Sequence, residues 1–311
     1  MRLVRGSYNW LTSYASQGCV ATIGNFDGIH RGHQAVIQAL QQKAAALNLP
    51  TVLISFSPHP KEFFAKEPAP ARLTRLRDKY LLLAAQGIDY FLCLPFNQSL
   101  ATAAPQDFIQ DLLVDRLHIR HLIVGEDFRF GFKRQGDYHL LQQQGLIHNF
   151  AVETLPVILH HQQRISSSWI RAALQVGDLN LAASLLGRPY TLSGRVAHGD
   201  KRGRTIGFPT ANIHLLGKTA PLLGVYAVRI QGLDKIYEGV ANIGHRPTLG
   251  GTRDQLEVHI FDFAEEIYGC HLTIEFKEKI RDEKKFANFE ELKQQIAADA
   301  HYAKQLLRMP A

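Results

Sequence analysis

The order of strand-like and helix-like segments limits the fold of this 311-residue chain more than any other feature. Four short apolar runs, rich in β-branched or aromatic residues, indicate buried parallel strands at 20–23, 51–54, 90–93 and 122–124. Helical patterns separate them, as in the apolar residues spaced between 35 and 47. The alternation predicts an open, doubly wound, Rossmann-like α/β sheet, with ligands bound at the carboxyl ends of its strands.

Beyond residue 186 the pattern changes to strands alone. Strand-like runs cover 190–196, 224–230, 236–243, 256–261 and 272–276, and no helix between them is long enough for a parallel crossover. We expect an antiparallel β-barrel. A terminal helix should follow, because Asn288 and Glu291 resemble a capping box and residues 289, 292, 296, 300, 303 and 307 form an apolar stripe. The predicted layout is an α/β domain over 1–186 and a β-barrel with a terminal helix over 187–311.

The composition is that of an ordinary globular protein, with 46% hydrophobic and 20% charged residues. Cys19, Cys93 and Cys270 are scattered, which indicates a reducing, cytoplasmic location and no structural zinc. The most apolar stretch, 80–96, is interrupted by glycine, aspartate and proline, so we expect no transmembrane segment and no membrane partner. No secretory signal is visible.

A net charge of +7 favours anionic ligands. Two classes fit it. Nucleic acid would suit the charge, although the lysines and arginines are dispersed, and nucleotide phosphates would need only a few placed cations. The charge by itself leaves both open.

The first motif is Gly24-Asn-Phe-Asp-Gly-Ile-His-Arg-Gly-His33, which joins the first of the four predicted strands to a helix. Such a turn brings backbone N–H groups and the positive end of a helix to one spot, which suits phosphate. His30 and His33 are three residues apart and can face the same anion, stabilising charge on a phosphorus centre. The alternative is an ordinary turn with two surface histidines, but the His-x-Gly-His spacing resembles the signature of the nucleotidyltransferase superfamily.

Two further segments fit a nucleotide site. Gly-Glu-Asp-Phe-Arg-Phe-Gly at 125–131 follows the fourth predicted strand, and Ile-Ser-Ser-Ser-Trp-Ile-Arg at 165–171 places hydroxyls ahead of a helix with an arginine inside it. Hydroxyls and an arginine at a helix start can hold a triphosphate. The alternative is that these serines simply cap the helix, because serine-rich helix starts are common N-caps.

These motifs, with Ser-Phe-Ser-Pro-His-Pro at 55–60, resemble the FMN adenylyltransferase module of bacterial bifunctional FAD synthetases over most of residues 1–185. The resemblance implies a nucleotidyltransferase-like domain in which the FMN phosphate attacks the α-phosphorus of ATP, with Mg²⁺ and release of pyrophosphate. It implies that His30 and His33 stabilise the transition state. Nucleotide and flavin binding would fall to Gly24, Asn25, Phe26, Asp27, Asp127, Arg129, Ser166, Ser167, Ser168 and Arg171, of which Ser166, Ser167 and Arg171 hold the pyrophosphate. The family usually has threonine where this chain has Ser168, but the hydroxyl is kept.

The second candidate site begins in the run 199–212, Gly-Asp-Lys-Arg-Gly-Arg-Thr-Ile-Gly-Phe-Pro-Thr-Ala-Asn. It is not a P-loop, because the second glycine comes one residue early and arginine replaces the required lysine. It could still wrap a polyphosphate, or be a solvated loop. Thr210 and Asn212 alternate on an extended segment and offer neutral oxygens on one face, which suits Mg²⁺ with substrate phosphates. Glu257, on a predicted strand, is a candidate general base, although a lone glutamate on a strand is usually just solvated.

This run, with Gly-Val-Ala-Asn-Ile-Gly at 239–244, Glu-Val-His-Ile-Phe-Asp at 257–262 and Arg-Asp-Glu-Lys-Lys-Phe at 281–286, closely resembles riboflavin kinase over 187–311. The resemblance implies that Thr210 and Asn212 bind Mg²⁺–ATP and that Glu257 deprotonates the ribityl 5′-hydroxyl. It also implies that Gly199, Lys201, Gly203, Arg204 and Gly207 cover the phosphates, while the 281–286 segment, with Arg281 and Glu283, closes on the flavin.

The sequence thus predicts a bifunctional enzyme with riboflavin, FMN and FAD as substrates and products, ATP as co-substrate and no nucleic acid partner. Two alternatives remain at this point. One domain could be inactive, or the barrel could bind RNA, although it lacks an aromatic pattern of the RNP type. The fifteen histidines show no carboxylate–histidine cluster with metal-ligand spacing. No recognisable pattern in the sequence indicates the oligomeric state, transfer of FMN between sites, the relative rates or the reversibility. The same is true of the preferred divalent ion and of the flavin contacts in the first domain.

Overall fold

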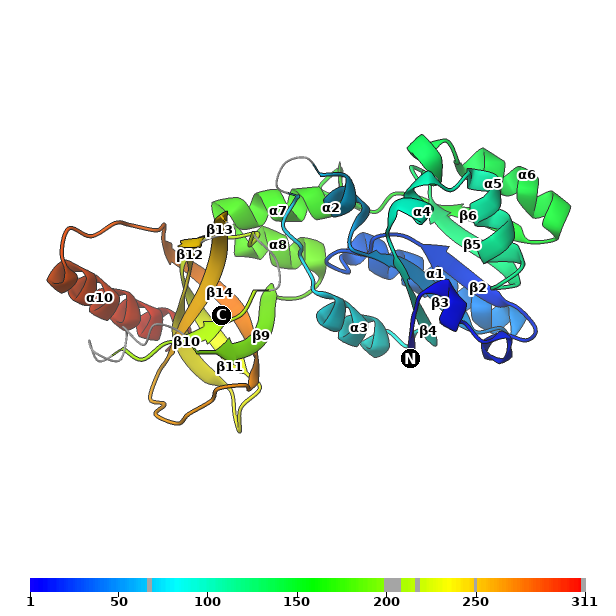
Figure 1. The fold of residues 1–311 in the computed structure, drawn as a ribbon. Helices are drawn as coiled ribbons and strands as arrows, with labels where there is room; N and C mark the ends of the chain where they lie inside the picture. Colours follow the sequence, from blue (N-terminus) through cyan, green and yellow to red (C-terminus); the bar gives the residue numbers. More distant parts are fainter. Residues whose placement is uncertain (66–68, 199–207, 216–218, 249–250, 309–311) are drawn as a thin grey trace. The chain divides into compact units, whose positions relative to one another are not determined.

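The computed structural model describes the chain except for residues 66–68, 199–207, 216–218, 249–250 and 309–311. The chain divides into two compact units. The first contains Met1–Ala69 and Thr74–Ser166, and the second contains Pro70–Leu73 and Ser167–Ala311. Each unit is built around its own sheet (Figure 1).

The first unit is a six-stranded parallel sheet in the order β1-β4-β3-β2-β5-β6. The predicted strands are confirmed as β2 (Cys19–Ile23), β3 (Thr51–Ser57), β4 (Tyr90–Pro95) and β5 (Ile119–Gly125). The edge strands β1 (Arg2–Arg5) and β6 (Ala151–Leu155) were not predicted. The strand order reverses beside β2, and this is the point at which doubly wound sheets bind ligands.

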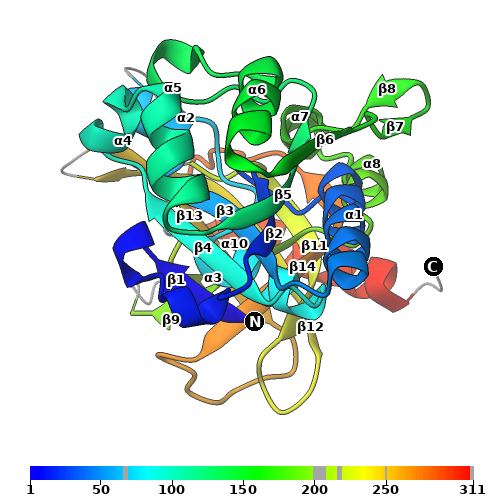
Figure 2. The same cartoon turned by 90° about the vertical axis from the view of Figure 1, so that its right-hand side faces the viewer.

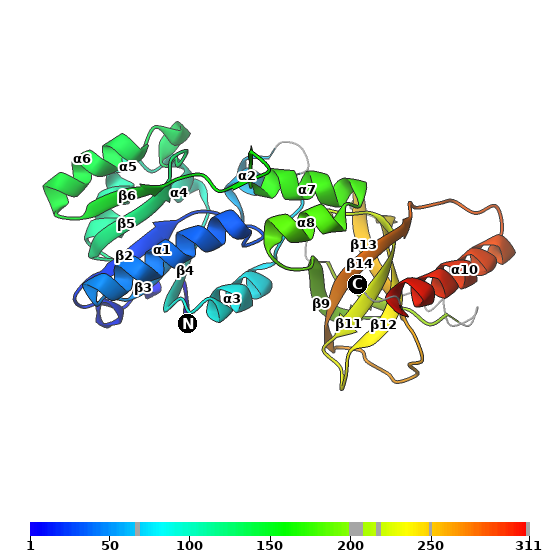
Figure 3. The ribbon, with the colours of Figure 1, turned by 180° about the vertical axis from the view of Figure 1, so that it is seen from behind.

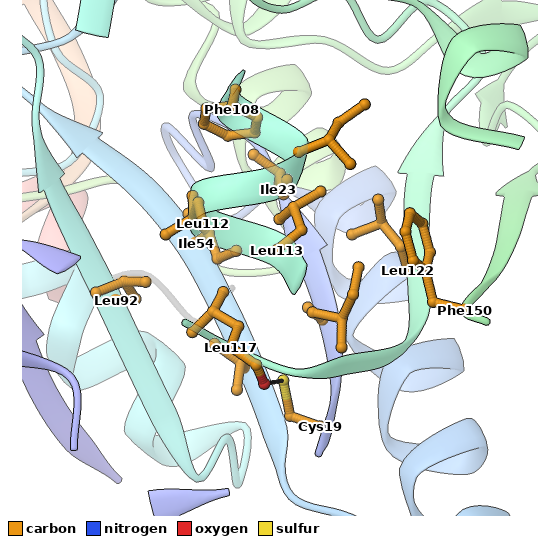
Figure 4. Packing of buried hydrophobic residues seen from close by; sticks show 14 of the residues in the cluster. Cys19, Ile23, Ile54, Leu92, Phe108, Leu112, Leu113, Leu117, Leu122 and Phe150 are labelled. Atoms are coloured by element: carbon orange, nitrogen blue, oxygen red, sulfur yellow. Dashed lines mark hydrogen bonds between the residues drawn. The ribbon is translucent and has the colours of Figure 1, made fainter. Parts of the chain in front are cut away.

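Helices cover both faces of this sheet, so its central strands are apolar on both sides. The elements are α1 (Arg31–Leu47), α2 (Pro60–Phe64), α3 (Leu76–Ala85), α4 (Gln98–Thr102), α5 (Pro105–Asp107), the π-helix η3 (Phe108–Val114) and α6 (Tyr138–His148), with 3₁₀ turns at Ser7–Asn9, Thr12–Tyr14 and Phe132–Arg134 and a small hairpin, β7 (Leu159–His160) with β8 (Gln163–Arg164). Neighbouring residues of β3 serve opposite faces: Leu53 packs with Leu40 of α1, and Ile54 packs with Leu113 of η3. Figure 2 shows α1 and α5 on opposite sides of the sheet, and Figure 4 shows the core on the η3 face. The doubly wound prediction is confirmed.

The second unit contains a closed antiparallel barrel in the order β10-β13-β12-β11-β14-β9. The five predicted strands are confirmed as β9 (Thr191–Ala197), β11 (Gly224–Gln231), β12 (Tyr237–Thr248), β13 (Gly251–Ile260) and β14 (His271–Arg281). The short β10 (Ala211–Ile213) was not predicted as a strand, and it closes the barrel between β9 and β13. Two helices, α7 (Ser167–Val176) and α8 (Leu179–Leu186), precede the barrel and pack on each other.

The terminal helix α10 (Phe289–Arg308) packs on the outside of β11, β12 and β14, as Figures 1 and 3 show. The last part of its predicted apolar stripe, Ala300, Ala303 and Leu307, is buried against the barrel. Asn288 caps the helix by accepting the Glu291 N–H at 2.9 Å. The capping box is only half formed, because the Glu291 carboxylate accepts from the N–H of Ala287 (3.3 Å) instead of that of Asn288.

Candidate active sites

The turn after β2 is held in an unusual backbone conformation. Phe26, Gly28 and Ile29 have φ values of 46°, 90° and 44°. Positive φ is costly for a β-branched residue, and such a conformation persists only where the surroundings enforce it. Here the side chains of Phe26 and Ile29 are buried in the core beneath α1. The strained backbone therefore lies directly after β2, where the strand order of the sheet reverses.

The predicted ligand residue Asp27 supports this turn from below. Its buried carboxylate accepts hydrogen bonds from the backbone N–H of Thr74 (3.0 Å) and from the Thr74 hydroxyl (3.2 Å). The same hydroxyl oxygen accepts the Gly28 N–H at 3.0 Å. Asp27 and Thr74 together anchor the turn to the segment that leads into α3.

His30 and His33 are brought together at the start of α1. His30 is buried and caps the helix, its Nδ1 accepting the backbone N–H of His33 at 3.3 Å. Since that nitrogen is an acceptor, the proton of the neutral ring lies on Nε2, which is then a donor. The two rings stack with centroids 3.6 Å apart. A Cβ at Gly32 would lie 3.2 Å from the His30 ring, which explains the glycine of the His-x-Gly-His motif.

The electrostatic environment keeps the His33 ring neutral. Burial lowers its pKa well below the usual value, and the neighbouring charges of His30 and Lys79 act in the same direction. Its Nδ1 is buried and has no hydrogen-bond partner within the described part of the chain. An unsatisfied ring nitrogen beside a helix N-terminus and a turn of backbone N–H groups can take part in binding an anion.

A lysine that sequence reasoning missed lies behind this turn. Lys79, on α3, is buried, and its Nζ donates to the backbone oxygen of Asn25 at 2.5 Å and to Ser55 Oγ at 3.3 Å. The Ser55 hydroxyl also donates to the Asn25 oxygen, at 3.1 Å. The one available signal was its position four residues before Leu83, on the buried face of the helix.

Four phenylalanines lie at the carboxyl ends of β3 and β4 and on α2, and sequence reasoning missed them as well. The ring of Phe96 lies 5.4–5.7 Å, edge to face, from those of Phe56, Phe63 and Phe64. Phe64 leaves 61% of its surface exposed. An exposed aromatic cluster at the ligand-binding edge of the sheet offers an apolar surface to a flat ring.

The other predicted residues of the first site are more scattered. Asp127 and Arg129 follow β5, which neighbours β2, and both are exposed. Asp127 pairs with Arg164 at 2.9 Å, and this hydrogen bond lowers the pKa of the Asp127 carboxyl. Ser166 ends the first unit. Ser167, Ser168 and Arg171 lie on α7 in the second unit, where Arg171 Nε donates to the Ala71 oxygen at 2.5 Å.

The barrel unit has a cavity of about 400 Å³ on its outer surface, bounded by α10 and the segment after β14. One wall is apolar and includes Phe289, Leu292 and Ile296, the first part of the α10 stripe. Four predicted site residues line the cavity: Thr210, Glu257, Arg281 and Glu283. The remaining lining residues are Phe208, Val225, Val240, Asn242, His259, Lys284, Phe286 and Asp299.

Strand pairing places three polar residues in one row. Asn212 of β10 lies opposite Glu257 of β13, which lies opposite Asn242 of β12. The residues on either side of Glu257 in β13, Leu256 and Val258, are fully buried inside the barrel, so the row is on the outer face. Asn242 and Glu257 of this row line the cavity together with Thr210, whereas Asn212 is not among the lining residues. Neutral oxygens and a carboxylate at one place are groups that suit a hard cation with phosphates.

An ion pair ties the end of β14 to α10 in the wall of the cavity. Arg281, at the end of β14, donates to both carboxylate oxygens of the buried Asp299 on α10, at 2.7–3.0 Å. Gln295 adds a further hydrogen bond to Asp299 at 2.9 Å. Glu283 lies so close to Gly244 that a Cβ there would overlap its carboxylate. The Arg281 guanidinium is thus held by the Asp299 carboxylate through a bidentate contact.

His259, also in the cavity wall, is tied to the segment that carries Thr210. Its Nδ1 donates to the backbone oxygen of Pro209 at 2.9 Å. Burial lowers the pKa of His259, so the ring is neutral near pH 7. Gly199, Lys201, Gly203, Arg204 and Gly207, predicted to cover the phosphates, lie outside the described residues.

Two family models match the chain. One, described as FAD synthetase, matches residues 12–169, and the other, described as riboflavin kinase, matches residues 186–307. The chain is 51% identical over 300 residues to a bifunctional riboflavin kinase/FMN adenylyltransferase of Escherichia coli K12, with 96% of each chain covered. It is 48% identical over 305 residues to the protein of the same name in Haemophilus influenzae, with 98% of each covered.

A solved structure shares the fold over nearly the full length. Its TM-score is 0.81 at 30% identity, it covers 98% of this chain and 99% of its own, and its title is "Crystal Structure of Macrolide-efflux Protein from Streptococcus pneumoniae". Among the described residues of this chain, no helix combines the length and apolarity needed to cross a membrane.

The fold and the two sites define an enzyme with one domain for nucleotidyl transfer and one for phosphorylating an alcohol. The chain belongs to the family of bifunctional riboflavin kinase/FMN adenylyltransferases. The prediction of the family, and with it of both activities, is confirmed.

Proposed function

We propose that the barrel cavity phosphorylates riboflavin to FMN and that the β2 edge of the first unit adenylylates FMN to FAD, with ATP as the donor in both reactions. The observation that carries the assignment is the row Asn212–Glu257–Asn242 beside a cavity that Thr210 also lines. The functional domains are proposed to be 1–186 and 187–311, supported by the matched ranges 12–169 and 186–307. By packing, residues 167–186 cluster with the barrel instead.

In the kinase reaction, Glu257 takes the proton from the ribityl 5′-hydroxyl as that oxygen forms a bond to the γ-phosphorus of ATP and ADP leaves. The apolar wall of Phe289, Leu292 and Ile296 would bind the isoalloxazine ring. Arg281 and Glu283 would hold the closing segment against the flavin.

The residues present fit Mg²⁺ in this site. The Thr210 hydroxyl and the Asn212 amide oxygen are hard, neutral ligands, and the Asn212 oxygen is already oriented by accepting a hydrogen bond from Gln255. Bound with ATP, the ion would neutralise charge on the phosphates. Gly199, Lys201, Gly203, Arg204 and Gly207 would cover those phosphates.

In the adenylyltransferase reaction, a phosphate oxygen of FMN attacks the α-phosphorus of ATP and pyrophosphate leaves. His30 and His33 would donate ring N–H groups to the phosphate oxygens as charge develops there. The turn 24–28 would bind the nucleotide through its backbone. Pyrophosphate would be held by Ser166, Ser167 and Arg171, with Ser168, Asp127 and Arg129 assisting nucleotide or flavin binding.

The location is proposed to be cytoplasmic, supported by three free thiols at Cys19, Cys93 and Cys270. No nucleic acid or membrane partner is part of the proposal.

The test is a time course with riboflavin, ATP and Mg²⁺, with the flavins separated by chromatography. FMN should appear first and FAD afterwards. A second reaction supplied with FMN tests the adenylyl transfer independently. FMN that accumulates without FAD would contradict the assignment of the first unit, and no phosphorylated flavin would contradict that of the barrel.

A further inference from the structure

Lys79 is an unusual residue to find in the interior of the first unit. Only 7% of its surface is exposed, whereas lysine is almost never fully buried without compensation. Removing an ammonium group from water costs free energy that hydrogen bonds must recover. A buried lysine beside a proposed phosphate-transfer site therefore calls for a specific explanation.

Two hydrogen bonds of Lys79 lie at the start of the turn after β2. Its Nζ lies 2.5 Å from the Asn25 backbone oxygen and 3.3 Å from Ser55 Oγ, and Ser55 itself donates to the same oxygen at 3.1 Å. Three elements meet there: α3, the end of β3 and the turn after β2. The Asn25 carbonyl is thus clamped by two donors from two different elements.

The Asn25 carbonyl immediately precedes the strained part of the turn. The next residue, Phe26, has φ 46°, and Ile29 has φ 44°. A turn in such a strained conformation keeps one geometry only if surrounding contacts hold both of its ends. The Asp27–Thr74 hydrogen bonds fix one side, and the Lys79–Asn25 hydrogen bond fixes the other.

The ammonium group also acts on the catalytic histidines. Burial lowers the pKa of His33 most, and the positive charge of Lys79, like any positive charge on His30, lowers it further. The stacked rings are 3.6 Å apart, so a shift of the turn would move both donors relative to a bound phosphate. Displacement of a positioned group by about 1 Å can cost a hundredfold in rate.

From this geometry we infer that Lys79 is a positioning residue for adenylyl transfer, acting through the Asn25 carbonyl on the phosphate-binding turn. The inference rests on the proposed function of the first unit. It assigns to α3 a role in the reaction that no motif in its sequence indicates.

The test uses the full chain with FMN and ATP for FAD formation, and with riboflavin and ATP for FMN formation as an internal control of folding. In Lys79→Gln, kcat/KM for ATP in FAD formation should fall about tenfold or more, while FMN formation is unchanged. Ser55→Ala, which removes one of the two donors, should give a smaller fall in the same direction. Lys43→Gln is the matched control, since Lys43 makes a half-exposed ion pair with Glu153 on the same unit.

A pH profile separates positioning from a merely structural role. Loss of the ammonium charge should raise the pKa of His33, so the acid limb of FAD formation should move to higher pH in Lys79→Gln. Unchanged FAD kinetics and an unchanged acid limb in both folded variants would overturn the inference, as would an equal loss of both activities. No FAD from the unmodified chain would overturn the proposed function, and the inference with it.

Discussion

The imidazole rings of His30 and His33 lie face to face at the start of α1, with centroids 3.6 Å apart and planes inclined by 15°. Two cationic rings at that distance would repel strongly, and burial lowers the pKa of His33 well below its usual value, so the His33 ring is neutral near pH 7. Under the proposed function, these rings would donate hydrogen bonds to phosphate oxygens, and the N-terminus of α1 would add positive potential.

Replacing His33 with alanine should abolish FAD formation and leave FMN formation intact. The change removes a donor that acts on the developing charge, which costs about a hundredfold or more in kcat. Both rates can be read in one chromatographic assay, so the kinase serves as the control for folding. Parallel loss of both products in a folded variant would contradict the separation of the two sites.

The stability of the protein should decrease as pH falls below about 6.5, the ordinary pKa of histidine. In the folded state the pKa of His33 is lowered by burial, so below pH 6.5 the unfolded chain binds a proton that the folded chain does not. His121 and His259 have lowered pKa values and contribute in the same direction.

Urea unfolding at pH 5.5, 6.5 and 7.5 measures this dependence. Between pH 5.5 and 6.5, the unfolding free energy of His33→Gln should depend less steeply on pH. The reduction should correspond to at most one bound proton per molecule. The slopes of the two proteins should converge above pH 7.5. Identical slopes at acid pH would mean that His33 is protonated in the folded state.

Much of the fold could be predicted because the spacing of apolar residues indicates where the helices and strands lie. The central strands β2 to β5 are buried on both faces and are almost continuously apolar, so they are visible in the sequence. The edge strand β1, Arg-Leu-Val-Arg, is only four residues long and half polar. Strand β10 has three residues, and its pairing with two neighbours depends on tertiary contacts that no local pattern records.

The sites divide in the same way. Site residues in motifs of fixed spacing, such as His30 and His33, could be predicted because residues close in the sequence stay close in the folded chain. The row Asn212–Glu257–Asn242 needs the register of three strands that are distant in sequence. Lys79 reaches the turn from a helix more than fifty residues away, and its burial reverses the usual expectation for lysine.

Replacing Glu257 with glutamine should stop FMN formation and spare FAD formation from supplied FMN. The amide keeps the shape of the side chain but cannot take the hydroxyl proton, and loss of a general base costs about 10²–10⁴-fold. Glu278→Gln is a matched control, because that glutamate is exposed on β14 and is not part of the cavity wall. A rate near that of the unmodified enzyme in Glu257→Gln would exclude Glu257 as the base.

Replacing Asp299 with asparagine should destabilise the barrel and raise KM for riboflavin. The change leaves the Arg281 guanidinium without its carboxylate in a largely buried place, which costs about 3 kcal/mol of unfolding free energy. Asp262→Asn provides the comparison, since Asp262 pairs with Lys304 at 3.5 Å on the surface and should cost less than about 1 kcal/mol. Equal effects in urea unfolding would mean that the Arg281–Asp299 pair adds nothing beyond a surface contact.

Replacing Phe64 with alanine should raise KM for FMN in FAD formation about tenfold while leaving KM for riboflavin in the kinase reaction unchanged. Phe64 is the most exposed ring of the cluster with Phe63 and Phe96, so its loss removes surface available to a flat flavin ring at little cost to the core. Stacking on one aromatic ring contributes roughly 0.5–1.5 kcal/mol beyond the area it buries. Leu146→Ala on α6 removes an even more exposed side chain, 85% accessible, and should change neither constant. If KM for FMN stayed the same in Phe64→Ala, the flavin would have to bind elsewhere along the sheet edge, and the turn at β2 would be the next place to test.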